Sequence, residues 1–591
     1  MSSVFSVVKA FCCGRNDDRR RGKVSAGMKI SLCMIVKDEQ QLLARCLDSV
    51  RHVVDEMVIV DTGSRDRTRE IASSYGARMV DFTWTNDFAA ARNVALGHAS
   101  GDWILCLDAD ELLKMPVGGS GLDQLAAADE ADAYSVPIQN NKLEGGFEFH
   151  YAIRFFRKLP GIRFIGKVHE RVDESLFHEQ ARIRQAPFSI EHTGYAIPPE
   201  EMEEKLKRNA KLLQDQIEQD PGNCFAHYYL GLTWIGLKEF DKSFLHLRRA
   251  RQLGPATINL SCLIDNILAY HYLDREDYLT AATIARRSLR ALPEQNTAKL
   301  FLGIALFNQG SHREALPLLR AAYQFLRLPI ESRRTQLSQE HSYNEADLLW
   351  ALTRSAAETG DYEGAFAYVQ QVLRLRPGDA KAYLAKALCC LSLDATVEAR
   401  TALARARHLG LPARDLAWAA LQLALKTGDL NAASAVLMDH ADALLENDMG
   451  RQAFATWVDR YVRAGKEDTL FKLLLQMNQQ HSESPAILDA LAFTAIRQGR
   501  YLDARRALER LSLLVPSQPD IMKRLAGIYL HLGQRELAAR MLQKVRAADL
   551  EGLGSAVGNS YPLPKGGTDG GPFNPASSGI CRRAGPEVHD G

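Results

Sequence analysis

The chain has 591 residues, more than a single hydrophobic core usually accommodates, so several domains are expected. Its 73 basic and 72 acidic residues leave a net charge of +1, and this balance argues against nucleic acid or an anionic membrane as a partner. The ten scattered cysteines form no CxxC pair, which argues against a disulfide framework or a zinc module and favours a reducing, cytoplasmic setting. No run approaches the ~18 apolar residues that a transmembrane segment needs.

The first 27 residues are predicted to form a disordered N-terminal arm. They contain a cysteine pair, Cys12-Cys13, followed by the basic run Arg19-Arg20-Arg21. Acylation of the cysteines beside this basic cluster stays open as an alternative. The simpler interpretation of the segment is a frayed chain end, and it is the one we favour.

Residues 28–198 are predicted to form an α/β domain, in which short apolar strands alternate with amphipathic helices. Strands are expected at 30–36, 57–60, 78–80 and 103–107, and helices at 40–52, up to 75, and at 88–98. Near-continuous apolar strands separated by helices predict a parallel sheet that is covered on both faces. Ligands of such sheets bind beyond the carboxyl ends of the strands, where three of the four strands here are followed by acidic residues.

Residues 199–550 are predicted to form a linker helix, near 200–220, and then an all-α array of tetratricopeptide-like repeats. Small residues recur 34 positions apart within three runs, at Ala281 and Ala315, at Ala365, Ala399 and Ala433, and at Ala504 and Ala538. Glycine precedes the second helix of several units, at Gly310, Gly360, Gly499 and Gly533. A period of 34 residues is typical of repeats that bury their apolar faces by stacking, and it predicts eight or nine units in an α-solenoid. The Gly- and Pro-rich residues 551–591 are predicted to be a disordered tail.

The segment with the clearest chemistry is Leu105–Glu111, in which an apolar strand ends in Asp108, Ala109 and Asp110. Side chains alternate along an extended segment, so the two aspartates can share one side. Mg²⁺ or Mn²⁺ binds a few carboxylates together with phosphate oxygens and water. The pair is therefore a candidate for holding a metal that neutralises a leaving nucleoside diphosphate.

Four motifs in order resemble family 2 glycosyltransferases, which have the GT-A fold. They are Asp38-Glu39 after the first strand, Asp61–Thr68 after the second, Ala91-Arg92-Asn93 on the following helix, and Asp108-Ala109-Asp110. The resemblance covers residues 28 to about 196. It implies an inverting, metal-dependent enzyme that uses a nucleotide-sugar donor, expected to be UDP-linked, with Mn²⁺ or Mg²⁺.

The resemblance also implies roles for the donor site. Asp61 would contact the base of the nucleotide, with Arg92 beside it, while Asp38 and Glu39 would lie near the nucleoside. For Asp61 the alternative is a residue that stabilises its own turn. For Arg92 it is a salt bridge on the helix surface or at the sheet edge.

In the same family, Asp108 would contact ribose, metal and diphosphate, and Asp110 would ligate the metal. His192 stands where GT-A enzymes often supply a third metal ligand, and its neutral imidazole would suit that role. The alternative for His192 is a strand-end residue bonded to backbone.

An inverting transfer also needs a base that deprotonates the acceptor. The matching region ends in His169-Glu170, and Glu170 is predicted to be the base. His169 replaces one of the family's usual paired acids and is the rival. A buried structural pair, with Glu170 bonded to Arg171 or Arg154, is the alternative.

A further cue is Trp84–Asn93, with Val-His-Glu and His-x-Gly-Tyr later in the chain. Together with the repeats, it looks like bacterial glycosyltransferases that include peptide S-glycosyltransferases. It implies a peptide or protein acceptor, or a cell-surface glycan, with the repeat array recruiting the acceptor or a protein partner.

Two other functions compete with this one. In the first, the array is a scaffold and the first domain an inactive sugar-nucleotide-binding head, although the intact Asp108 and Asp110 argue against decay. In the second, the chain is a nucleotidyltransferase, but Lys37-Asp38-Glu39 lacks the Gly-rich basic loop expected after the first strand.

Overall fold

The computed structural model describes residues 28–116, 118–141, 147–192, 199–255, 257–328, 344–516 and 518–551. The predicted N-terminal arm with Cys12 and Cys13, and all of the predicted tail except residue 551, lie outside these ranges. The chain separates into two compact units, one of residues 1–309 with 321–342, the other of residues 310–320 with 343–591.

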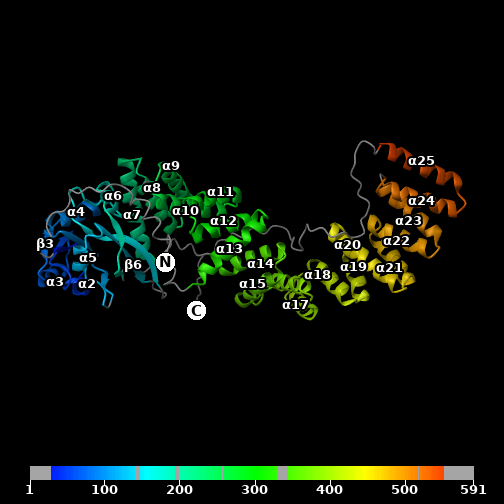
Figure 1. Ribbon diagram of the computed structural model, residues 1–591, viewed down its shortest axis with the longest axis horizontal. Coiled ribbons are helices and arrows are strands. Elements are labelled where there is room, and N and C mark those ends of the chain that lie inside the picture. The colour runs from blue at the N-terminus through cyan, green and yellow to red at the C-terminus, as the bar shows by residue number, and fades with distance from the viewer. Residues whose placement is uncertain are drawn as a thin grey trace. The chain divides into compact units, whose positions relative to one another are not determined.

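The first unit contains a mixed sheet of nine described strands (Figure 1). They are β1 (Ile30–Val36), β2 (Glu56–Asp61), β3 (Arg78–Asp81), β4 (Trp103–Cys106), β5 (Glu111–Lys114), β6 (Ala133–Asn141), β7 (Phe147–Arg157), β8 (Ile183–Gln185) and β9 (Ser189–His192). The order across the sheet is β3-β2-β1-β4-β7-β6-β9-β5, and β8 pairs with β6. The four predicted strands are parallel neighbours, whereas β7 runs antiparallel to both β4 and β6.

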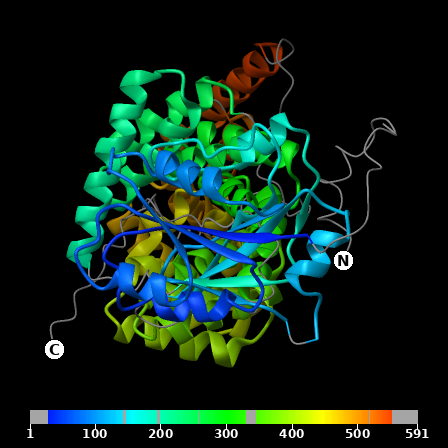
Figure 2. The ribbon, with the colours of Figure 1, turned by 90° about the vertical axis from the view of Figure 1, so that its left-hand side faces the viewer.

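Helices cover both faces of this sheet, as Figure 2 shows. They are α2 (Leu43–Val50), α3 (Thr68–Ser74), α4 (Phe88–His98), α5 (Leu122–Ala127) and α6 (Asp173–His178). Helices α2, α3 and α5 share one apolar cluster with the sheet, and α4 and α6 share another, on the other face. The prediction of a sheet covered on both faces is therefore confirmed.

The remaining helices form the tetratricopeptide-like part. They are α7 (Pro199–Gln219), α8 (Cys224–Gly236), α9 (Phe240–Gln252), α10 (Ile258–Asp274), α11 (Tyr278–Ala291), α12 (Asn296–Asn308), α13 (His312–Leu326), α14 (Glu345–Glu358), α15 (Tyr362–Leu375), α16 (Ala380–Ser392), α17 (Thr396–His408), α18 (Ala413–Thr427), α19 (Leu430–Leu445), α20 (Asp448–Arg463), α21 (Glu467–Gln480), α22 (Pro485–Arg497), α23 (Tyr501–Leu514), α24 (Pro519–His531) and α25 (Arg535–Glu551). Among the described residues, α8 to α25 supply two helices for each of nine repeats, within the predicted number.

The repeat signals have the structural roles that the sequence suggested. Every alanine of the 34-residue spacing is at most 1% exposed, so a larger side chain would separate neighbouring helices. The repeat glycines lie between helices with φ values from 69° to 84°, the left-handed region that glycine tolerates best.

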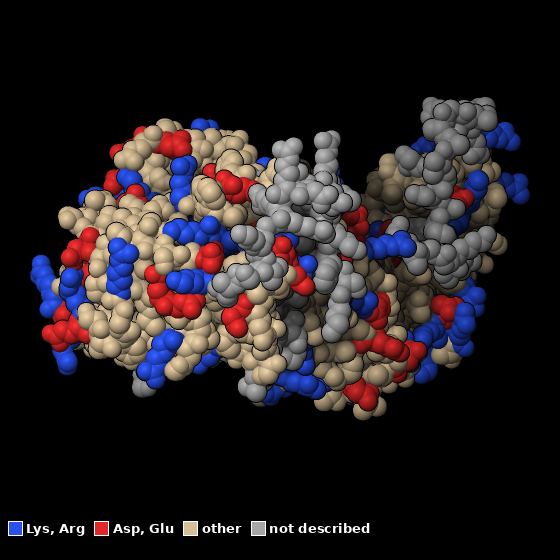
Figure 3. Space-filling view, turned by 60° about the vertical axis from the view of Figure 1, so that its left-hand side comes forward, with Lys and Arg blue, Asp and Glu red and all other residues tan. Residues whose placement is uncertain are grey.

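Acidic and basic side chains are mixed on the face of the molecule in Figure 3. This distribution agrees with the balanced composition. None of the helices in the described part of the chain has both the length and the apolar character that crossing a bilayer would require.

Candidate active site

The sheet brings the predicted acidic residues to one edge. Val36, the last residue of β1, is in register with Asp61, the last residue of β2. On the other side of β1, β4 ends at Cys106, and Asp108 follows two residues later. Because β1 lies between β2 and β4, Asp61 and Asp108 are separated by two strand spacings, roughly 10 Å. The nucleotide and metal positions predicted from the sequence therefore share one edge of the sheet.

The loops after β1 and β2 are joined by hydrogen bonds of the second predicted motif. The backbone N–H of Asp38 donates to Ser64 Oγ at 3.0 Å, and Asp38 Oδ1 accepts from the backbone of Arg65 at 2.7 Å. The backbone N–H of Glu39 donates to Thr68 Oγ1 at 2.7 Å. Asp38 itself has a left-handed φ of 56°. The motif thus fixes the shape of the loop beside which a nucleoside is predicted to lie.

Asp61 is buried and held by its own turn and by helix α3. It accepts hydrogen bonds from the backbone of Ser64 at 3.2 Å and from Arg69 Nη1 at 2.8 Å. Burial alone would raise the pKa of Asp61, but these hydrogen bonds outweigh it and hold the pKa below its usual value. Asp61 is therefore anchored as a carboxylate at the strand end.

Arg92 has partners other than the one predicted. The resemblance placed it beside Asp61, but its Nη2 lies 2.6 Å from Asp108 Oδ1 and its Nε lies 2.5 Å from Glu170 Oε1. The side chain is buried on α4, whose first turn is capped by Asp87. Arg92 is thus the link between the predicted base and the predicted metal-binding strand end.

Asn93, the next residue of the motif, fixes the segment that leads to Glu170. Its side-chain amide donates to the carbonyl of Phe164 at 2.9 Å and accepts from the backbone N–H of Phe164 at 2.8 Å. Within the Ala-Arg-Asn motif, Arg92 thus pairs with Glu170, and Asn93 holds the backbone of the segment that leads to it.

Two further charged residues complete the cluster, Glu111, to which the sequence analysis gave no role, and Arg154, which entered it only as an alternative partner of Glu170. Arg154, on β7, lies 3.2 Å from Asp108 Oδ2 and 2.7 Å from Glu111 Oε1. Glu111 is 1% exposed and also accepts from the backbone N–H of Asp108 at 2.9 Å. The acid directly after Asp110 was a sequence signal for Glu111, but nothing nearby marked Arg154.

The electrostatics of this cluster follow from its burial and its two arginines. Burial disfavours the charged form of Asp108, but Arg92 and Arg154 outweigh it and hold the pKa of this carboxyl well below its usual range. Burial raises the pKa of Glu39 to about 7, and the nearby charges of Asp110 and Asp108 add to the shift. Glu39 thus belongs electrostatically to the same acidic group.

Asp110 and His192 come together, as predicted. His192 Nε2 lies 3.0 Å from Asp110 Oδ2, and its Nδ1 lies 2.9 Å from the amide oxygen of Asn140. The contact arises because Glu111 of β5 is in register with His192 of β9. Burial opposes protonation of His192, but Asp110 outweighs it and raises the pKa of the ring.

The donor set fits a divalent cation that takes part of its ligands from a substrate. Within the described ranges, no three or more His, Cys, Asp or Glu side chains are grouped to hold a metal ion by themselves. Asp110 and His192 offer one oxygen and one nitrogen, while the carboxylate of Asp108 is engaged by Arg92 and Arg154. One or two protein ligands completed by phosphate and water oxygens are usual for Mg²⁺.

The loop between Ile165 and Arg171 separates the two candidate bases. Its ends are joined by two backbone hydrogen bonds of 2.9 and 3.0 Å. Glu170 binds Arg92, whereas the ring of His169 stacks on Tyr229 of α8 with centroids 4.4 Å apart. His169 stays partly exposed, yet desolvation lowers its pKa. Glu170 is paired with Arg92, and not with Arg171 or Arg154, the partners that the alternative gave it.

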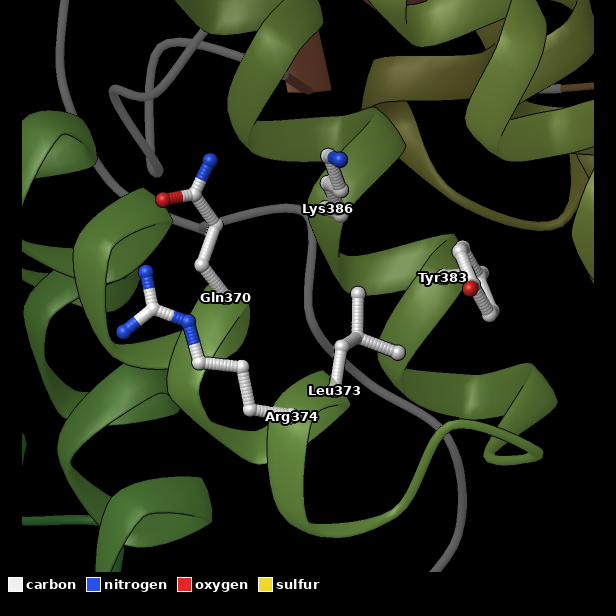
Figure 4. Close-up of a pocket in the computed structure, with 5 residues that line it drawn as sticks. All are labelled: Gln370, Leu373, Arg374, Tyr383 and Lys386. Atoms are coloured by element: carbon white, nitrogen blue, oxygen red, sulfur yellow. The ribbon is translucent and has the colours of Figure 1, made fainter.

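A hollow of about 290 Å³ lies in the second unit and has different chemistry (Figure 4). It is lined by Gln370, Leu373, Arg374, Tyr383 and Lys386. These side chains include no carboxylate that could ligate a metal. The acidic edge of the sheet is therefore the stronger candidate for catalysis.

Comparisons with known proteins agree with this description. Residues 31–178 match the model of glycosyl transferase family 2, and residues 268–327, 356–422 and 495–552 match models of the tetratricopeptide repeat. The structure of YrrB, a TPR protein, is similar over 34% of this chain and 93% of that chain, with a TM-score of 0.28 and 17% identity. So distant a similarity supports no statement about binding.

Among curated proteins, a TPR repeat-containing protein of Synechococcus elongatus is 38% identical over 214 residues, which are 35% of this chain and 52% of that protein. The glycosyltransferase SunS of Bacillus subtilis is 27% identical over 230 residues, 37% of this chain and 53% of SunS. The chain thus spans about half the length of these relatives. It joins a domain of glycosyl transferase family 2 to an array of tetratricopeptide repeats.

Proposed function

We propose that this chain transfers a sugar from a nucleotide-sugar donor, UDP-linked, to an acceptor, with inversion at the anomeric carbon. The observation that carries the proposal is the continuous link from Glu170 through Arg92 to Asp108, beside the Asp110–His192 contact. It joins a group that can accept a proton to the groups that can stabilise a leaving diphosphate. Family 2 membership supports glycosyl transfer as the reaction class.

Asp110 and His192 would hold a Mn²⁺ or Mg²⁺ ion, with Asp108 as a further ligand if its carboxylate leaves one of its arginines. When bound, such an ion neutralises charge that develops on the leaving nucleoside diphosphate. Before the metal binds, Arg92 and Arg154 fix the orientation of Asp108, because each binds a different oxygen of that carboxylate. Asp108 is thus held in one orientation before the donor binds, and one of these ion pairs would open for Asp108 to ligate the metal.

Glu170 would take the proton of the acceptor as its nucleophile attacks the anomeric carbon. Its Oε1 accepts a hydrogen bond from Arg92, which orients the carboxylate, and its Oε2 would take the proton. At the opposite end of the donor, Asp61 would contact the base, and the Asp38–Glu39 loop would lie beside the nucleoside.

The acceptor is proposed to be a peptide or protein, or a cell-surface glycan, in the cytoplasm. Repeats of this kind present extended surfaces, and they would recruit the acceptor or a protein partner. This part of the proposal rests on the presence of the repeats and on the resemblance of Trp84–Asn93 to peptide-modifying enzymes.

A screen of sugar nucleotides with the full chain tests the enzyme proposal. We expect release of UDP that requires Mn²⁺ or Mg²⁺ and stops on chelation. The variant Asp110→Asn should lower turnover by at least about 100-fold, because a charge that faces the leaving group is lost. The control Asp123→Asn alters an exposed aspartate of the same domain and should have no effect. If no sugar nucleotide is turned over with either metal, the scaffold with an inactive head is the better account.

A further inference from the structure

The loop that carries Glu170 is packed against helices outside the sheet domain. Val168, which is 8% exposed, belongs to an apolar cluster with residues of α7 and α8. The helical members of this cluster are Ala210, Leu212 and Leu213 of α7 and Ala226 and Leu230 of α8. Phe88, the first residue of α4, packs against the same cluster. The two segments that present Glu170 and Arg92 therefore meet on one surface of the helical part.

Directional contacts hold the same loop in place. The backbone N–H of Lys167 donates to Gln216 Oε1 of α7 at 3.1 Å. The carbonyl of Lys167 accepts from the backbone N–H of Phe88 at 2.9 Å. Lys167 thus joins the loop both to α7 and to the start of the helix that carries Arg92.

Aromatic contacts with α8 flank Glu170 on both sides along the chain. His169 stacks on Tyr229 with an interplanar angle of 11°, and the guanidinium carbon of Arg171 lies 3.1 Å from the centre of the Phe225 ring. His169 also has a left-handed φ of 54°, a strained conformation in a residue that is not glycine, which persists only where its surroundings hold it. Tyr229 is the ring that packs against His169 here.

We propose that Tyr229, on the first helix of the repeat array, is a positioning residue that holds the 165–171 loop so that Glu170 meets Arg92. The sheet domain contributes the Phe88–Lys167 hydrogen bond and the Arg92–Glu170 ion pair to this loop. The stack on Tyr229 is the described ring contact of His169, which directly precedes Glu170. The first repeat helices are then a working part of the active site, and not only a surface for partners. This inference rests on the proposed function of Glu170.

The test compares three variants of the full chain with the wild type. Tyr229→Ala removes the stack, Tyr229→Phe keeps it without the hydroxyl, and Tyr501→Ala removes a similar stack, that of Tyr501 on His531 with centroids 4.6 Å apart, in the second unit. Turnover and KM for the sugar nucleotide are measured together with hydrogen exchange of residues 165–171. We expect Tyr229→Ala to lower kcat between about 10-fold and 100-fold, because small displacements of a reacting group are costly.

The same variant should leave KM for the donor within twofold and should speed hydrogen exchange in the 165–171 loop. Tyr229→Phe should restore both quantities, and Tyr501→Ala should change neither. If Tyr229→Ala does not fold, Tyr229→Leu keeps an apolar side chain there and should give the same separation of kcat from KM.

Equal loss of kcat in the Tyr229 and Tyr501 variants, or unchanged exchange in the loop, would overturn the inference. If the wild type turns over no sugar nucleotide, the proposed function has failed, and exchange alone then decides about the loop. Faster hydrogen exchange in Tyr229→Ala, but not in Tyr229→Phe or Tyr501→Ala, would still show that α8 holds the 165–171 loop.

Discussion

The sheet domain and the helical repeats each hold a carboxylate between two arginines, but in different surroundings. At the edge of the sheet, two buried arginines, Arg92 and Arg154, share the carboxylate of Asp108. In the repeats, the carboxylate of Asp265 is 3% exposed and is held by Arg251 at 2.7 Å and Arg287 at 2.6 Å. Each region thus places two cations on one acid.

What surrounds each group differs, and the difference separates catalysis from packing. Asp265 and its arginines come from the neighbouring helices α9, α10 and α11, so the contact joins two successive repeats. The cluster at the sheet edge has further members, Glu111 and Glu170, and its central side chain, Asp108, remains 36% exposed. Burying this many charges costs more than an apolar core would. A cluster of charged side chains that is costly to bury and partly open to solvent is better explained by substrate binding than by a contribution to stability.

Within the sheet-edge cluster, loss of the proposed base, Glu170, should lower activity most. Glu170→Gln keeps an oxygen that can accept from Arg92 but can no longer take a proton at neutral pH. We expect turnover to fall by about 10²–10⁴-fold. The midpoint of thermal unfolding should stay within a few degrees of the wild type. Single-turnover measurements with saturating donor report the chemical step directly.

Glu179→Gln, an exposed glutamate in the same domain, serves as the matched control and should keep full activity. His169→Ala should lower turnover no more than Tyr229→Ala does, since both variants remove the same stacking contact. A loss from His169→Ala larger than that from Glu170→Gln would exchange the roles of the two residues.

The next effect compares the two buried clusters by stability. Arg154→Met leaves Glu111 buried without its cation, and breaking such a pair costs about 3–5 kcal/mol. Arg287→Met removes the more exposed of the two partners of Asp265 and leaves Arg251 in place, so it should cost about 1 kcal/mol. Urea unfolding of both variants and the wild type, followed by circular dichroism, measures the difference.

Equal losses in the two variants would mean that the sheet-edge cluster is no more dependent on its cations than an ordinary repeat contact. The energetics of the sheet-edge cluster would then give no reason to assign it a chemical role. Measuring activity separates the two variants further, since Arg154 contacts Asp108 and Arg287 does not.

Much of the fold could be predicted because its signals are local. The strand at 30–36 and the helix at 88–98 were predicted with the bounds that the structure has, since charged residues end the one and Asp87 caps the other. The second half of the sheet was not predicted. Its strands pair with partners far along the chain, as β4 does with β7, and no local pattern records such pairing.

The candidate site divides in the same way. The acidic residues at strand ends could be placed from the sequence, because parallel strands end at one edge of a sheet. Arg92 was recognised by its motif but given the wrong neighbour, since the motif does not record which strand end its helix faces. Tyr229 could not be found at all, because its contact with His169 depends on how α8 packs against the loop.

The smallest effect concerns a pair of histidines in the repeats, His227 and His246. His227 Nδ1 and His246 Nδ1 lie 3.0 Å apart, so one ring must donate and the other accept. Burial and the neighbouring His227 lower the pKa of His246 to about 4, below the usual 6.5 of histidine. Between pH 6.5 and about 4, His246 is therefore protonated in the unfolded chain but neutral in the folded chain. Stability from this pair is complete above pH 6.5 and falls as the pH drops through that window.

His246→Gln removes the titrating ring and should flatten this dependence. Between pH 7.5 and 5 we expect the wild type to lose about 1 kcal/mol more unfolding free energy than the variant, a difference that urea titrations at the two pH values resolve. The result bears on the comparison directly, because the sheet edge stabilises its charges with arginines while this pair stays neutral in the fold. If both proteins lose stability in parallel, the folded chain accepts protons on these rings, and His227 and His246 are not kept neutral by the fold.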